Sequence, residues 1–306
     1  MSACLVRGVR SVELVATNPE EAARFYETVW GLTPVERRND SLYFRGTIGY
    51  HHVLGLHSGT QPAIARIVFD VPDRAGVDAL HAKIAAVGGK PGRPAKLTAP
   101  GGGYGFGCKD PEGRNLAFVC EAADHAGADT AENADRPRKI THVNLNVRDF
   151  DASLAFFTGV LGFRVIDDNA PLWFLHCANT DHHSIVFAKT GLSTLNHIAF
   201  ELPDLDSVMR GIGRMKDNGY PVEWGPGRHG AGNNVFGYFC GPDEVPLEYT
   251  AEVTQIDDSY VPRGSDYWKF PPNRSDQWGI TQPRSARYYR VQRLFGFTAG
   301  GEDINS

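Results

Sequence analysis

The segments VRSVELVA (residues 9–16) and ITHVNLNV (residues 140–147) decide the fold, because the second repeats the first after an interval of 131 residues. The same interval carries ARFYETVWGL (residues 23–32) onto LAFFTGVLGF (residues 154–163). A repeat that runs without gaps through several blocks predicts two copies of one structural unit. The length of 306 residues, at roughly 150 residues per domain, agrees with two domains.

Each half divides again into two units with the order strand, helix and three more strands. Alternating apolar residues in VELVA predict the first strand, and apolar residues at helical spacing over 22–29 predict a helix that ends at Gly31. The segment ARIVFDV (residues 65–71) begins the second unit, whose helix ends at Gly88 and Gly89. We therefore expect an α+β fold of four βαβββ modules in two pairs.

Composition shifts along the chain predict its domain boundaries. We expect an N-terminal domain over 1–124, a linker rich in Ala and Asp over 125–138, a C-terminal domain over 139–252 and an unrepeated tail over 253–306. The tail carries several aromatic residues, which are Tyr260, Tyr267, Trp268, Phe270 and Trp278. It is interpreted as a lid over a pocket or a subunit contact, with a strap on the barrel exterior as the remaining alternative.

Polar residues that occur in only one half indicate where the chemistry lies. The second half has His142, His197 and Glu248 in predicted strands, where the first half has Ser11, Arg66 and Ala117. Two histidines and one carboxylate from separate strands are typical of the facial triad of non-heme Fe(II) oxygenases, which leaves three coordination positions free. The sequence thus predicts a metal site in the second half.

A second group of polar residues lies near this triad in the sequence. His183 precedes an apolar run, and His229 and Tyr238 follow one another in the segment before Glu248. A histidine that does not bind the metal but lies beside it is a candidate general acid or base. The first half also has histidines at the point matching His183, namely His51 and His52, so a structural role shared by both halves stays open.

The segment GRHGAGNNVFGYFCGPDEVPLEYTAE (residues 227–252) resembles the signature of the vicinal oxygen chelate superfamily. Within that superfamily the chain is most similar to the two-domain type I extradiol ring-cleaving dioxygenases of aromatic catabolism. Residues 140–163 and LNHIAFEL (residues 195–202) similarly resemble the family segments that hold two histidine ligands. The resemblance implies two open barrel domains of the glyoxalase/bleomycin resistance/dioxygenase fold, with the active site in the C-terminal barrel.

The resemblance also implies a role for each candidate residue. It implies that His142, His197 and Glu248 bind Fe(II), with Mn(II) as the alternative metal. It makes His183 the acid-base residue, with His182 as the close alternative. His229, Tyr238 and Asn144 would contact the substrate, and the first half would be non-catalytic.

The implied function is extradiol cleavage of a catechol-type diol by O₂. One alternative is a metal-dependent isomerase or epimerase on the same scaffold, although such sites commonly use four protein ligands. Another is a non-enzymatic small-molecule binding protein of the bleomycin-resistance sort. Such proteins are typically single short modules that lack the triad.

Composition narrows the classes of partner. Lys and Arg number 31 against 36 Asp and Glu, which gives a net charge of -5 and disfavours a nucleic-acid-binding surface. No apolar run approaches the roughly 18 residues of a membrane span. The five cysteines are scattered, which predicts no disulfide framework and fits a reducing compartment. We expect a cytoplasmic homo-oligomer whose partners are a small catecholic substrate and O₂.

Overall fold

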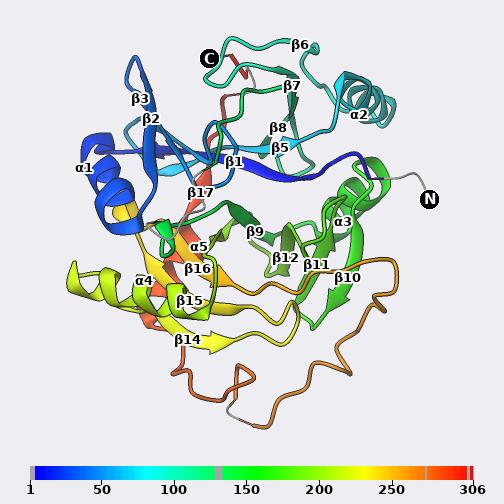
Figure 1. Cartoon of the computed structure of the whole chain (residues 1–306). Helices are drawn as coiled ribbons and strands as arrows, with labels where there is room; N and C mark the ends of the chain where they lie inside the picture. Colours follow the sequence, from blue (N-terminus) through cyan, green and yellow to red (C-terminus); the bar gives the residue numbers. More distant parts are fainter. Residues whose placement is uncertain (1–3, 128–132, 273, 302–303, 306) are drawn as a thin grey trace.

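The strands form two open mixed sheets, one from each half of the chain (Figure 1). This computed structural model describes residues 4–127, 133–272, 274–301 and 304–305. Part of the expected linker, residues 128–132, lies outside the described residues. Both sheets follow the same path through their modules, which confirms the α+β fold of paired βαβββ modules.

The N-terminal sheet joins its two modules through their first strands. Its strands are β1 (Gly8–Ala16), β2 (Thr33–Arg38), β3 (Ser41–Arg45), β4 (Leu54–Ser58), β5 (Ala63–Asp70), β6 (Ala95–Lys96), β7 (Tyr104–Lys109) and β8 (Asn115–Cys120). Their order is β2-β3-β4-β1-β5-β8-β7-β6. β1 pairs antiparallel with β5, and each of these pairs in parallel with the last strand of its own module.

The C-terminal sheet repeats this arrangement strand for strand. Its strands are β9 (Ile140–Val147), β10 (Arg164–Asp168), β11 (Leu172–His176), β12 (Ile185–Lys189), β13 (Thr194–Glu201), β14 (Trp224–Arg228), β15 (Val235–Cys240) and β16 (Pro246–Ala251). Their order is β10-β11-β12-β9-β13-β16-β15-β14. β9, β13 and β16 are therefore neighbours at the centre. β12 begins two residues after His183, so that histidine lies in the loop rather than in the strand.

The repeat extends to the signals that start the helices. The module helices are α1 (Pro19–Arg24), α2 (Arg74–Ala86), α3 (Phe150–Ala155) and α4 (Leu205–Asp217). The residues that cap them are Asn18, Asp73, Asp149 and Asp204. The side chain of each accepts a hydrogen bond from the backbone N–H of the residue three positions later. A 3₁₀ turn, Pro242–Glu244, precedes β16. Among the described residues, no helix combines the length and the apolar character that crossing a membrane requires.

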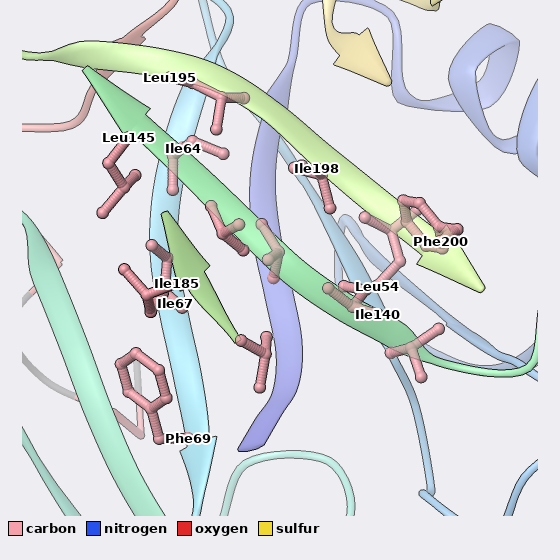
Figure 2. Close-up of a cluster of buried hydrophobic side chains, with 14 of the residues drawn as sticks. Leu54, Ile64, Ile67, Phe69, Ile140, Leu145, Ile185, Leu195, Ile198 and Phe200 are labelled. Atoms are coloured by element: carbon pink, nitrogen blue, oxygen red, sulfur yellow. The ribbon is translucent and has the colours of Figure 1, made fainter. Parts of the chain in front are cut away.

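Buried side chains from both sheets form one continuous core. Figure 2 shows Ile64 and Ile67 of β5 close to Leu145 of β9 and to Leu195 and Ile198 of β13. All five are fully buried. The two halves are thus held together by the burial of apolar surface, the main favourable term in folding.

Aromatic contacts of Trp30 tie the first helix of the chain to the C-terminal sheet. α1 continues as a π-helical turn, Phe25–Trp30, which ends at Gly31 with a left-handed φ of 93° that favours glycine. The turn directs Trp30 onto Tyr249 of β16, with the two rings stacked at 3.8 Å. Tyr249 Oη also donates a hydrogen bond to the backbone carbonyl of Trp30 at 2.7 Å. The corresponding turn in the second half is Phe156–Val160.

The tail contacts both halves of the molecule. After β16 it runs as an irregular segment along the C-terminal domain, drawn in orange in Figure 1. It then forms α5 (Ala286–Leu294), which packs against β13, and β17 (Gly296–Phe297), which adds to the N-terminal sheet beside β5. Part of the tail therefore connects the two domains.

Replacing Trp30 with alanine tests the contact between the halves. Because Trp30 is fully buried, Trp30→Ala should lower the free energy of unfolding by about 3–5 kcal/mol. Denaturant unfolding followed by circular dichroism measures this. Val87→Ala is the control, since Val87 is 62% exposed and should change stability by no more than about 0.5 kcal/mol. Equal stabilities of the two variants would contradict the proposed role of the stack.

Candidate metal centre

The three predicted metal ligands come from the three central strands of the C-terminal sheet. His142 lies on β9, His197 on β13 and Glu248 on β16. The strand register brings them together, because Ala199 of β13 pairs with both His142 and Glu248. His142 Nε2 lies 3.1 Å from His197 Nε2 and 3.4 Å from Glu248 Oε2, and His197 Nε2 lies 2.9 Å from Glu248 Oε2.

Side-chain alternation along these strands separates the site from the core. Successive side chains of a strand point to opposite faces. On β9, His142 and Asn144 line the pocket while Val143 and Leu145 join the hydrophobic core. On β13 the register is interrupted between Leu195 and His197, which lets two consecutive residues, Asn196 and His197, reach the pocket.

The donor set fits a divalent metal ion. The ligand atoms of His142, His197 and Glu248 all lie within 4.8 Å of one another, and the three residues are buried. Glu248 Oε2 is buried and accepts no hydrogen bond of normal geometry. His197 Nδ1 lies 2.9 Å from Asn196 Oδ1, an acceptor, so His197 Nε2 keeps its lone pair for a ligand. Two imidazoles and one carboxylate suit Fe(II) or Mn(II).

Electrostatics keep Glu248 and His197 in the protonation states that a metal requires. Burial alone would raise the pKa of the Glu248 carboxyl, but the adjacent His142 and His197 side chains hold it far below its usual range. Burial lowers the pKa of His197 to about 4. The site therefore presents an ionised carboxylate and neutral imidazole at neutral pH, the forms that bind a cation.

His183 and not His182 lines the pocket beside the ligands. The rings of His183 and His142 have centroids 4.4 Å apart, whereas His182 lies behind His183 with its Nε2 on Asp167. Burial lowers the pKa of His183 well below the ordinary value of histidine, so its imidazole is neutral. This geometry favours His183 over His182 as the acid-base candidate.

His229 and Tyr238 also line the pocket. Tyr238 pairs with Glu248 across β15 and β16, and Tyr238 Oη lies 2.9 Å from His229 Nε2. The His229 ring stacks on Phe236 at 3.9 Å. Burial lowers the pKa of His229 to about 3 and raises that of Tyr238 well above its ordinary value. Both groups are neutral hydrogen-bonding partners at physiological pH.

The pocket has a volume of about 280 Å³ and is lined partly by the tail. The sequence predicted that the tail aromatics, Trp268 and Phe270 among them, form a lid over a pocket, a subunit contact or an exterior strap, and it named no other tail residue of the pocket. The tail residues that line the pocket are Trp268, Phe270, Ser275, Arg284 and Gln292. The Arg284 guanidinium lies 4.4 Å from the centre of the Trp224 ring. The clustered tail aromatics were the only sequence signal for this placement.

Two neighbours hold the ring of His197. Asn196 accepts from His197 Nδ1, and Gln292 of α5 donates to the backbone carbonyl of Asn196 at 3.1 Å. Asn144 has a different status, because its buried Oδ1 has no hydrogen-bond partner among the described residues. The tail helix therefore supports a ligand, while Asn144 keeps an acceptor available inside the pocket.

The matching place in the N-terminal domain contains no ligand set. Ser11, Arg66 and Ala117 stand there, and Arg66 forms a buried ion pair with Glu13 at 3.1 Å. The pocket beside them measures about 30 Å³ and is lined in part by Ile304 of the tail. A volume of this size holds a water molecule or two rather than an aromatic ring.

Comparison with known proteins places the chain in a family. A family model, the Glyoxalase/Bleomycin resistance protein/Dioxygenase superfamily, matches residues 8–118 and 139–249. The chain belongs to this superfamily. Each match contains one pair of βαβββ modules, so the superfamily domain occurs twice.

Individual members of the superfamily resemble the chain to different extents. Metapyrocatechase 2 of Cupriavidus necator is 32% identical over 130 residues, 42% of this chain and 39% of that protein. An iron-dependent extradiol dioxygenase of Rhodococcus jostii (strain RHA1) is 28% identical over 178 residues, 51% of this chain and 59% of that protein. The chain thus spans about two to three fifths of these relatives.

A solved structure matches over nearly the whole chain. It is the Mn(II)-bound glyoxalase from Novosphingobium aromaticivorans, which is 35% identical with a TM-score of 0.87. The match covers 93% of this chain and 94% of that chain. The two chains therefore share their fold over nearly their whole lengths.

Removing the carboxylate tests the ligand set. Substituting a residue that hydrogen-bonds to a metal ligand typically lowers metal affinity roughly 10–100-fold. Glu248→Ala removes a ligand itself, so it should lower the affinity for Fe(II) by more than that. Elemental analysis after anaerobic loading and gel filtration measures the iron content. Tyr238→Phe is the control, since it removes only a hydroxyl beside Glu248 and should keep the iron. Full iron content in Glu248→Ala would show that the ion binds elsewhere.

The burial of His52, in the N-terminal domain, predicts that stability depends on pH. Burial lowers the pKa of His52 to about 4, against about 6.5 in the unfolded chain. The folded state therefore binds fewer protons, so stability is complete above pH 6.5 and falls as the pH drops towards 4. On the order of 2 kcal/mol is lost at pH 5 from this group.

His52→Gln should remove that part of the loss. We expect the difference in free energy of unfolding between pH 8 and pH 5 to shrink in the variant by on the order of 2 kcal/mol. Denaturant unfolding at the two pH values measures it. The comparison at pH 8 isolates the packing effect of the substitution. An unchanged difference between the two pH values would rule out this contribution.

Proposed function

We propose that the protein cleaves a catechol-type diol in extradiol fashion with O₂ at an Fe(II) ion held by His142, His197 and Glu248. The observation that carries this proposal is the three-ligand set beside a pocket lined by His183, His229, Tyr238 and Asn144. A facial triad leaves room for a bidentate substrate and O₂ together. The similarity to metapyrocatechase and to an iron-dependent extradiol dioxygenase supports the same chemistry.

The metal would contribute what the side chains lack. Iron(II) in this position supplies a Lewis acid that favours ionised diol oxygens, together with the redox capacity that O₂ chemistry requires. Mn(II) is the alternative ion, and the similar glyoxalase structure contains it. The same nitrogen and oxygen donors suit both ions.

His183 would act as the acid-base residue. Its neutral imidazole lies beside His142 and can accept a phenolic proton from a diol bound at the triad. The same nitrogen can return that proton when the ring opens. A fully buried base is protected from exchange with bulk water, which favours transfer to and from the substrate.

His229, Tyr238 and Asn144 would orient the substrate and O₂. All three line the pocket, and His229 and Tyr238 already lie within hydrogen-bonding distance of each other. Donors that are fixed before the reaction stabilise developing negative charge without reorganising. Phe174 and Trp224 supply apolar surface for an aromatic ring. The tail residues Trp268 and Phe270 would cover the ring as a lid.

Assembly and location rest on the sequence alone. We infer a homo-oligomer in the cytoplasm that binds a small catecholic substrate and O₂. Sedimentation of the purified protein tests the assembly.

A glyoxalase-type isomerase is the second candidate. It is favoured by one observation, the 35% identity over nearly the full chain to the Mn(II)-bound glyoxalase. Such a reaction rearranges its substrate without consuming O₂. The two candidates therefore differ in a directly measurable way.

Oxygen consumption decides between them. The chain should be loaded anaerobically with Fe(II) and mixed with catechols in air. Extradiol cleavage predicts O₂ uptake equal to substrate consumed and a yellow ring-fission product. No uptake with any catechol, or product formed without O₂, would overturn the proposal.

Substitution of His183 tests its role. His183→Gln should lower kcat about 10²–10⁴-fold, because general acid-base catalysis contributes a factor of that size. The matched control is His52→Gln, which alters the same position of the repeat in the N-terminal domain. Its kcat should equal that of the unmodified chain. Equal activity of the His183 variant would exclude the acid-base role.

A further inference from the structure

A chain of hydrogen bonds leads from His183 away from the pocket. His183 Nδ1 lies 3.0 Å from His182 Nδ1, and His182 Nε2 lies 3.0 Å from Asp167 Oδ2. All three side chains are almost completely buried, with exposed fractions of 2%, 0% and 1%. The hydrogen bonds that join these three side chains are therefore shielded from bulk water.

The Asp167 carboxylate, at the end of this series of hydrogen bonds, fixes the direction of each bond in the series. The Asp167 carboxylate accepts from Tyr260 Oη at 2.9 Å and from the backbone N–H of Arg263 at 2.7 Å. A carboxylate has no proton to give, so His182 Nε2 must donate to it. A neutral His182 then has only a lone pair at Nδ1, which must accept from His183 Nδ1–H. His183 Nε2, the remaining ring nitrogen, is left with its lone pair.

The N-terminal domain carries the same three positions in a looser form. The repeat matches Asp167, His182 and His183 with Glu36, His51 and His52. His51 Nδ1 lies 3.1 Å from His52 Nδ1, but His51 Nε2 is 3.5 Å from Glu36 Oε2. The Glu36 side chain is also 36% exposed, whereas that of Asp167 is fully buried. Only the C-terminal copy is tight and lies beside a ligand set.

We propose that Asp167 and His182 are positioning residues that hold His183 in the tautomer with hydrogen on Nδ1. In this tautomer His183 Nε2 is a proton acceptor, as a base requires. Tyr260 and Arg263, both from the tail, complete the shell around Asp167. The role of His183 as a base rests on the proposed function, but the placement of its hydrogen on Nδ1 does not.

Asp167→Asn should reverse the whole chain of hydrogen bonds. The backbone N–H of Arg263 can only donate, so it keeps an oxygen at the position of Oδ1 and turns the new amide nitrogen towards His182. That nitrogen donates to His182 Nε2, which moves the hydrogen of His182 to Nδ1. His183 then accepts at Nδ1 and carries its own hydrogen at Nε2.

Nuclear magnetic resonance of ¹⁵N-labelled histidine reads the tautomer directly. The full-length chain is prepared with diamagnetic zinc(II) in place of iron(II), and the loss of one signal set in His183→Gln assigns that residue. We expect His183 to carry hydrogen on Nδ1 in the unmodified chain and on Nε2 in Asp167→Asn. Glu36→Gln, the matched control, should leave the His183 signals unchanged. Hydrogen on Nε2 in the unmodified chain, or no change in a folded Asp167→Asn, would overturn the proposal.

Kinetics separate this proposal from the proposed function. With Fe(II), Asp167→Asn should lower kcat by about 100-fold or more while KM changes little, because the metal and the pocket wall are retained. Glu36→Gln should keep both constants. An unmodified chain without activity would refute the proposed function and leave the tautomer result standing. An active chain whose Asp167→Asn variant keeps full kcat would refute the positioning role.

Discussion

The alternation of side chains along three neighbouring strands is the constraint on which the rest of the structure depends. β9, β13 and β16 each present apolar residues to the common core, while β9 and β13 present polar residues to the pocket and β16 presents Glu248 to the ligand set. A shift of one residue in any of them would exchange the two sets. The core that joins the halves and the site that binds the metal are thus specified by the same strand register.

Duplication explains why only one half carries the chemistry. Both sheets, both pairs of helix caps and both paired histidines repeat at the same interval, so the scaffold is shared. The N-terminal copy has an Arg66–Glu13 ion pair and a very small pocket where the C-terminal copy has ligands. The first domain therefore contributes buried apolar surface, and the second contributes the candidate metal site. The tail packs against both domains.

Residue pattern was enough to predict the modules, the interval and the positions of His142, His197 and Glu248. Alternation and spacing are local signals, and the repeat supplied the comparison that separated site from scaffold. Other features depend on contacts between distant residues. The stacking of Trp30 on Tyr249, the support of Asn196 by Gln292 and the contact of Tyr260 with Asp167 join segments far apart in the chain. The choice between His182 and His183 likewise needed the fold, because neighbouring residues in a loop have no fixed face.

The central claim is that one metal ion binds between His142, His197 and Glu248, and that none binds at the corresponding place in the first half. Anomalous diffraction at the iron edge from crystals of the Fe(II)-loaded protein tests it most directly. The account predicts one strong peak about 2.0–2.2 Å from His142 Nε2, His197 Nε2 and a Glu248 carboxylate oxygen. A peak beside Ser11 and Arg66, or no peak within reach of the three ligands, would contradict it.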